Sequence, residues 1–82
     1  MRMVYRLNYI SLPANNNPET MYVISKWYVK PGNKVKAGDA LVAYEEDKSV
    51  VDIYSDYDGE IIEIYVQNDE TAAPGTKLCS IG

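Results

Sequence analysis

The chain has 82 residues, a formal net charge of −4, one cysteine and no histidine. This length allows one small domain with no second core. The single cysteine, Cys79, excludes an internal disulfide and fits a reducing cytosol, and without histidine the usual metal ligand and general base are missing. We therefore expect a cytoplasmic protein with no metal site and no catalytic residues.

The charges are unevenly distributed along the chain. Residues 39–70 contain eleven acidic residues and one basic residue, Lys48. This acidic half argues against a nucleic acid as ligand. No apolar run reaches 18 residues, and the first residues lack the apolar core of a secretory signal, so we expect no membrane partner.

The pattern along the chain favours β-strands throughout. Tyr, Val and Ile recur in short runs, and no segment has a sustained helical period. The expected strands, in chain order, cover residues 3–12, 21–29, 40–45, 50–54, 60–67 and 77–81. Turn signals separate them at Pro13–Pro18, Pro31–Asn33, Gly38–Asp39, Asp56–Gly59 and Pro74–Gly75. Short strands at this spacing predict an all-β sandwich or barrel.

The sequence also repeats itself at an offset of 37 residues. Tyr28-Val29 matches Tyr65-Val66, and the glycines at 38 and 75 recur at one turn position, where a positive φ would explain them. Two apolar-faced copies that pack face to face would share one core. The repeat-matched core candidates are Leu41 and Leu78, Val29 and Val66, and Trp27 and Ile64.

Lys48 lies at the midpoint of this repeat, within Glu45-Glu46-Asp47-Lys48-Ser49. A charged turn between two strand units presents its side chains at a tip. A lone lysine at a tip suits covalent attachment of a cofactor, and the alternative is an ordinary charged hairpin turn.

Residues 13–82 resemble the lipoyl (biotinyl/lipoyl-attachment) domains of 2-oxo acid dehydrogenase acyltransferases. The hallmark of that family is a lysine in an E-T-D-K-A turn, which Glu45–Ser49 echoes. The upstream family pattern is matched by Ile24–Leu41, and the downstream patterns are matched by Asp58–Val66 and Ala72–Leu78. The resemblance implies a flattened β-barrel/sandwich hybrid of two antiparallel sheets with an internal pseudo-two-fold repeat. We expect residues 1–82 to form a single domain of this type, with 1–12 as a candidate extra N-terminal strand.

The resemblance also implies a function. Lys48 would carry lipoate through an amide formed by a lipoate ligase or lipoyl transferase. The bound group would accept an acyl group from a thiamine-dependent 2-oxo acid decarboxylase and would be reoxidised by dihydrolipoamide dehydrogenase. The domain itself would be a non-catalytic carrier, as in a dihydrolipoamide acyltransferase. Recognition by these enzymes would fall on residues next to the lysine: Glu45, Glu46, Asp47 and Ser49.

Three departures from the family pattern bear on which enzyme would recognise this domain. Met21-Tyr22 replaces a small flexible element before the first repeat, Asp56 replaces the proline of an S-P-x-x-G turn, and Glu46 replaces the threonine of the hallmark. Two alternatives to a lipoyl carrier stay open. One alternative is an unmodified interaction module, as in the lipoyl-like hairpins of membrane-fusion adaptors. The other is a biotin carrier, which Asp47 and Ser49 disfavour because biotin carriers have methionine on both sides of their lysine.

Overall fold

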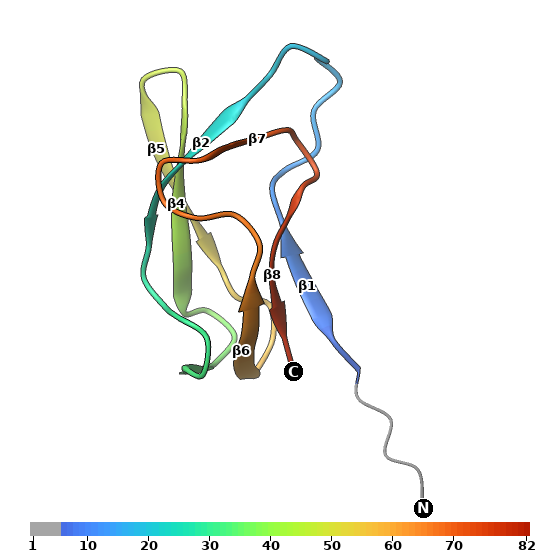
Figure 1. Cartoon of the computed structure of the whole chain (residues 1–82), viewed down its shortest axis with the longest axis vertical. Helices are drawn as coiled ribbons and strands as arrows, with labels where there is room; N and C mark the ends of the chain where they lie inside the picture. Colours follow the sequence, from blue (N-terminus) through green and yellow to red (C-terminus); the bar gives the residue numbers. More distant parts are fainter. Residues whose placement is uncertain (1–5) are drawn as a thin grey trace, which may run out of the picture.

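The computed structural model describes residues 6–82, which form two four-stranded antiparallel sheets (Figure 1). The first sheet has the order β5-β4-β2-β7 and the second has the order β1-β8-β6-β3. The strands are β1 (Asn8–Ser11), β2 (Tyr22–Trp27), β3 (Lys34–Val35), β4 (Ala40–Glu46), β5 (Ser49–Tyr54), β6 (Gly59–Ile64), β7 (Thr71–Ala72) and β8 (Lys77–Ile81). The described residues contain no helix, and the expected all-β fold of two antiparallel sheets is confirmed.

The strand order shows the pseudo-two-fold symmetry. An offset of 37 residues carries β2 onto β6, β3 onto β7 and β4 onto β8, so that each sheet maps onto the other. The hydrogen bonds repeat as well. Tyr28 N–H donates to the Leu41 carbonyl and Tyr65 N–H donates to the Leu78 carbonyl, both at 2.9 Å. The sequence repeat is therefore a structural repeat.

The two halves also exchange their shortest strands. β3 pairs with β6 and β7 pairs with β2, so that each sheet contains one strand from the other half. Reciprocal backbone bonds fix this exchange: Ile24 N–H donates to the Glu70 carbonyl, and Ile61 N–H donates to the Asn33 carbonyl, both at 2.9 Å. Neither two-residue strand was among the strands predicted from the sequence. Neither half can complete its sheet alone.

The core lies between the sheets and is built mainly from matched positions. Leu41 and Leu78, both expected there, are fully buried, as is the matched pair Ile24 and Ile61. The other expected core residues are less central: Val66 is 8% exposed, and the remainder are only partly buried against the cluster. These partly buried residues are Trp27, Val29 and Ile64.

A β-bulge explains the partial burial of Trp27. Strict alternation of side chains along a strand would put Trp27 on the face opposite Tyr22 and Ile24. The pairing of β2 with β4 instead shifts register between Ile24 and Lys26. An extra residue in one strand reverses which side chains face inward beyond it. Trp27 consequently turns toward the core, and its indole N–H donates to the Val66 carbonyl at 2.7 Å.

The turns are where the composition predicts them. Gly38 and Gly75 have φ values of 97° and 81°, a region that costs other residues energy, so the expected positive φ is confirmed at both. β1 covers only part of the expected strand 3–12, of which residues 3–5 lie outside the described residues. Across residues 6–82 there is no helix with the length and hydrophobicity needed to cross a bilayer.

Candidate functional site

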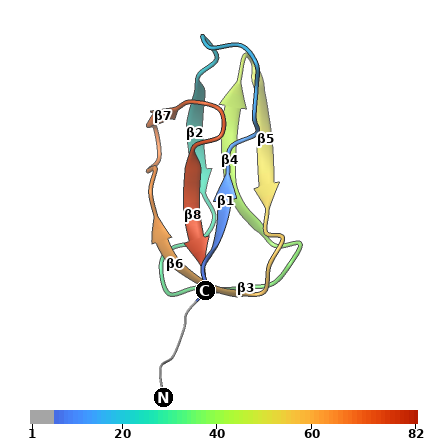
Figure 2. The same ribbon diagram turned by 90° about the vertical axis from the view of Figure 1, so that its right-hand side faces the viewer.

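Lys48 lies in the turn that joins β4 to β5, at one end of the molecule (Figures 1 and 2). The last residue pair of this hairpin is Glu46 with Ser49, so that only Asp47 and Lys48 form the turn. Asp47 has a φ of 54°. Asp tolerates this left-handed conformation better than most residues, because its short polar side chain can bond locally. The sequence therefore provides a tight turn with Lys48 at its second position.

The structure brings all five residues singled out from the sequence together at this tip. Glu45, Asp47, Lys48 and Ser49 are exposed, and Glu46 is half-buried. An exposed primary amine on a narrow hairpin can enter the active site of another enzyme without local unfolding. The geometry therefore suits covalent modification of Lys48.

A rigid base supports the tip. Tyr44 of β4 is buried, and its ring meets that of Tyr22 edge to face, with the ring centroids 5.0 Å apart. Burial raises the pKa of the Tyr44 phenol above its ordinary value. Tyr44 also pairs with Val51 across the hairpin. The exposed lysine is thus only a few residues from a packed aromatic pair, which joins the base of the hairpin to the core.

A polar groove separates the tip from the loop of residues 13–21. It is lined by Asn15, Asn17, Glu19, Thr20, Met21, Glu46 and Asp47. Side-chain oxygens order the loop: Asn17 N–H donates to Asn15 Oδ1 at 2.7 Å, and Glu19 N–H donates to Asn17 Oδ1 at 2.9 Å. The Asn-rich composition predicted a loop but not its location. Nothing in the pattern indicated that these residues flank Lys48.

Other reactive groups have structural surroundings. Cys79 is fully buried, and burial raises the pKa of its thiol to about 11. A protonated, inaccessible thiol is a poor nucleophile, so the surroundings of Cys79 suit a small structural residue. Within residues 6–82 no group of three or more His, Cys, Asp or Glu side chains is arranged to hold a metal ion.

The chain is similar to known proteins in its family profile, in its sequence and in its fold. A family profile described as "Biotin-requiring enzyme" matches residues 10–81. The lipoamide acyltransferase component of the branched-chain alpha-keto acid dehydrogenase complex of Bos taurus is 40% identical over 58 residues. These residues are 71% of this chain and 12% of that relative.

A bacterial relative and a solved structure agree with this match. The dihydrolipoyllysine-residue acetyltransferase component of the pyruvate dehydrogenase complex of Bacillus subtilis is 38% identical over 55 residues, which cover 67% of this chain and 12% of the relative. The lipoyl domain of the 2-oxoglutarate dehydrogenase complex from Azotobacter vinelandii superposes with a TM-score of 0.77 at 28% identity, covering 90% of this chain and 94% of that domain. The chain thus spans about one eighth of the length of these curated relatives and nearly all of the solved domain.

Proposed function

The chain belongs to the biotinyl/lipoyl-attachment family, and from this we propose that it is a lipoyl carrier domain with Lys48 as its attachment residue. One observation carries the proposal: an exposed lysine occupies the two-residue turn between β4 and β5, at the midpoint of a two-fold repeat. None of the other lysines of residues 6–82 lies in this turn: Lys26, Lys34 and Lys77 are in strands, Lys36 follows β3, and Lys30 lies between β2 and β3.

Two features support lipoate over biotin as the attached group. The relatives that match over two thirds of the chain are named as lipoamide or dihydrolipoyllysine components of dehydrogenase complexes. The residues beside Lys48 are Asp47 and Ser49, whereas biotin carriers place methionine on both sides of the lysine.

The residues of the tip fit such an attachment. The amine of Lys48 is exposed, so it can form an amide, and the amide removes its positive charge. A bound lipoyl group would supply acyl and electron transfer chemistry through its dithiolane. The protein's own part is presentation, because the buried Tyr22–Tyr44 pair holds the tip while the long side chain stays free. Tethering raises the effective concentration of the group at a partner enzyme, and no catalytic side chain of this domain is needed.

The proposed partners follow from the proposed cofactor. A lipoate ligase or lipoyl transferase would modify Lys48, a thiamine-dependent 2-oxo acid decarboxylase would supply the acyl group, and dihydrolipoamide dehydrogenase would reoxidise the arm. The relatives support this set, since their names place them in branched-chain and pyruvate dehydrogenase complexes. The cytoplasmic location stays a prediction that rests on the single cysteine.

The direct test is peptide mapping after incubation with lipoate ligase, lipoate and ATP. We expect one adduct, on Lys48, and none on a Lys48→Arg variant, which keeps the charge but cannot form the amide. Parallel incubation with biotin, ATP and a biotin ligase should leave the mass unchanged. An adduct on Lys26 or Lys77 would contradict the assignment of the site. No adduct with a ligase that labels a control domain would favour the unmodified interaction module.

A second test asks whether position or charge identifies the lysine. Exchanging Asp47 and Lys48 keeps the composition of the turn but moves the amine by one residue. We expect most of the labelling to be lost. Because Asp47 has a φ of 54°, lysine in its place should also cost about 1 kcal/mol of stability. The double variant Asp47→Lys, Lys48→Ala has the same strained lysine at position 47. Its free energy of unfolding is therefore the matched control for that of the exchanged protein. Equal labelling of the parent and the exchanged protein would show that the ligase reads charge alone.

A further inference from the structure

β5 is the most exposed of the long strands. Five of its six residues are exposed, and only Ile53 is partly buried. Two of its apolar side chains rank among the most exposed of residues 6–82: Val50 is 61% exposed and Tyr54 is 55% exposed. β5 is also an edge strand, because its only neighbour in the sheet is β4. One side of its backbone is therefore free to pair with another strand.

The hydrogen bonds at the end of β5 show which residues face this free edge. Ser55 N–H donates to the Asp39 carbonyl at 2.8 Å, and Gly38 N–H donates to the Ser55 carbonyl at 2.8 Å. Ser55 thus bonds inward on both sides. In an antiparallel pair, inward and outward residues alternate. Val50, Asp52 and Tyr54 consequently direct their backbone N–H and C=O groups away from β4.

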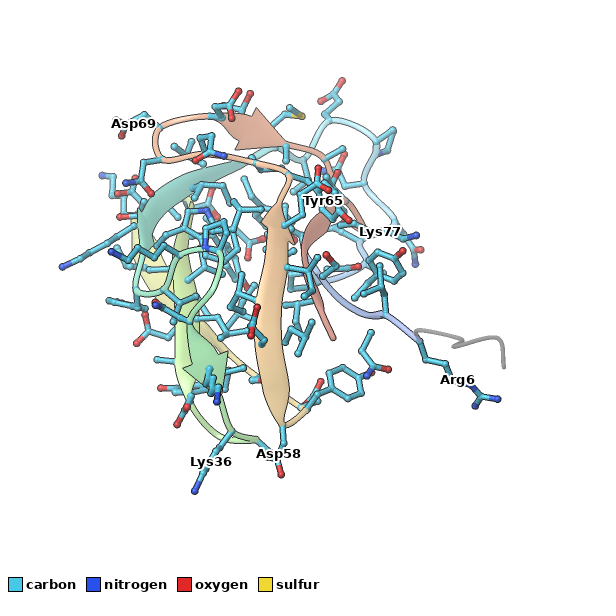
Figure 3. All side chains as sticks on the ribbon, turned by 60° about the horizontal axis from the view of Figure 1, so that its bottom comes forward. Arg6, Lys36, Asp58, Tyr65, Asp69 and Lys77 are labelled. Carbon is cyan, nitrogen blue, oxygen red and sulfur yellow. The ribbon has the colours of Figure 1, made fainter. Side chains whose placement is uncertain are left out.

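The other edge strands of the two sheets are shorter than β5. β3 and β7 have only two residues each, which leaves little backbone to pair with. β1 is the equivalent of β5 in the second sheet, but it has four residues against the six of β5. Lys77 of its neighbour β8 packs over the Tyr9 ring, with Nζ 3.9 Å from the ring centroid (Figure 3 labels Lys77). Lysine and proline on an edge strand hinder pairing with a further strand, and β5 contains neither of them.

We propose that the free edge of β5 is the docking strand for the enzyme that acylates Lys48, which adds an extended segment of its own chain as a fifth strand. This inference rests on the proposed function. β5 begins at Ser49, immediately after Lys48, so an enzyme that holds the lysine already covers the start of this edge. Main-chain pairing with an exposed edge is a recurrent mode of peptide recognition.

The side chains of β5 define the chemistry of the added strand. Val50, Asp52 and Tyr54 share the outer face of the sheet at a spacing of about 7 Å. Asp52 Oδ1 accepts a hydrogen bond from the Tyr28 hydroxyl at 2.8 Å, and the carboxylate has further acceptor sites available. The docking segment should therefore present a basic residue opposite Asp52, with apolar residues two positions before and after it.

The first experiment measures kcat/KM for ligase-catalysed lipoylation of the whole chain. Asp52→Pro removes an outward N–H without breaking the bonds to β4, and proline is tolerated at such edge positions. We expect kcat/KM to fall by about tenfold or more, since one interfacial hydrogen bond is lost and the ring obstructs the edge. The matched control is Tyr9→Pro at the equivalent position of β1, which should leave kcat/KM unchanged. Asp52→Ala keeps the N–H and isolates the contribution of the carboxylate.

The outcomes separate this inference from the proposed function. A parent protein that an active ligase does not acylate would overturn both. A parent that is acylated, together with an Asp52→Pro protein acylated equally fast, would overturn only the docking strand. A concentration-dependent dimer of the parent that Asp52→Pro abolishes would assign the edge to a second copy and would also overturn it.

Hydrogen exchange of the unmodified parent gives a test that does not depend on the folding of a variant. Saturating ligase should slow exchange at the amides of Val50, Asp52 and Tyr54, while the amides of Tyr9 and Ser11 should exchange as before. If hydrogen exchange slows only in the turn residues and not along β5, the ligase contacts only the tip, and the docking strand is wrong.

Discussion

The β4–β5 hairpin and the pairing of β8 with β1 occupy equivalent places in the two sheets, but only the hairpin is closed by a turn. The largest fully buried residues of the central strands agree between the two, as in Leu41 and Leu78. Residues that face outward differ: Asp52 bonds to Tyr28 on one sheet, and on the other Tyr9 stands beside Tyr65, with the ring centroids 6.5 Å apart (Figure 3 labels Tyr65). The repeat therefore preserves the centre of the core, whereas the surface of each half has its own chemistry.

The largest effect should come from the matched core leucines. Leu41→Ala and Leu78→Ala each empty a fully buried site, and such changes typically cost about 2–5 kcal/mol. Urea unfolding of both variants beside the parent measures the two costs. If the two-fold symmetry extends to packing, the costs should agree within about 1 kcal/mol of each other. A small loss at one site alone would mean that one half carries the core.

A difference between the central strands should be visible at Ser80 and its match, Ala43. Ser80 is fully buried and its hydroxyl has no hydrogen-bond partner, while Ala43 is 2% exposed. A buried unsatisfied polar group costs about 1–3 kcal/mol. Ser80→Ala should therefore stabilise the protein by about 1 kcal/mol, and Ala43→Ser should destabilise it by at least as much. A Ser80→Ala protein that unfolds at lower urea would show that the hydroxyl has a partner in solution.

Cys79 and its match Val42 should differ in their response to pH. Burial raises the pKa of the Cys79 thiol from its ordinary 9.0 to about 11. As pH rises from 9 to 11, the thiol ionises in the unfolded chain before it does so in the folded one, so this contribution to stability is present below pH 9 and is lost across that range. Cys79→Val should remove this part of the loss. Urea unfolding at pH 8, 9, 10 and 11 gives the difference, and parallel curves for parent and variant would contradict it.

Two matched turns test backbone strain. Gly32 has a φ of 93° and its match, Asp69, has a φ of 69°. A Cβ added at Gly32 would meet nothing within 4 Å, so Gly32→Asp should cost only the left-handed backbone penalty, about 1 kcal/mol. Asp69→Gly should change stability by less than that, because relief of strain is offset by the greater freedom of glycine in the unfolded chain. Thermal unfolding of both variants measures the two losses of stability. A larger loss for Asp69→Gly than for Gly32→Asp would contradict the prediction.

The smallest change in stability belongs to Lys48. The side chain is exposed, so Lys48→Ala should stay within about 0.5 kcal/mol of the parent in urea. We expect the same variant to lose cofactor labelling completely. Lys36→Ala, directly after β3 at the end of the molecule opposite the β4–β5 turn (Figure 2), is the control and should label normally. A Lys48→Ala protein that unfolds much more easily would give this lysine a structural role.

Much of the fold could be predicted from the sequence, because turn residues and short apolar runs are local signals. The six longer strands and the glycine turns at 38 and 75 follow from such signals. The strands β3 and β7 could not be predicted, since two residues carry no periodicity and their pairing depends on contacts with the other half. The bulge after Ile24 was hidden for a related reason: no residue type marks it, and it reverses the inward face of Trp27.

For the site, the turn containing Lys48 was readable because charged residues interrupt two apolar runs at the centre of a repeat. The loop beside it was not, because its proximity to Glu46 and Asp47 arises from the folding of distant residues. The exposed edge of β5 could not be predicted either. Its alternation of Val, Asp and Tyr looks the same in sequence whether or not a neighbouring strand covers it.

The antiparallel pairing of β1 with β8 has a mechanical consequence. Asn8 pairs with Ile81, so the two ends of the described chain leave side by side, remote from Lys48 (Figures 1 and 2). A force that pulls these two ends apart would break the backbone hydrogen bonds between β1 and β8 one after another, starting at Ile81. It would not load all of them at once in shear. Modest tension should peel β1 away first. The β4–β5 hairpin lies outside this path of force, so Lys48 should keep its orientation while the opposite end of the domain yields.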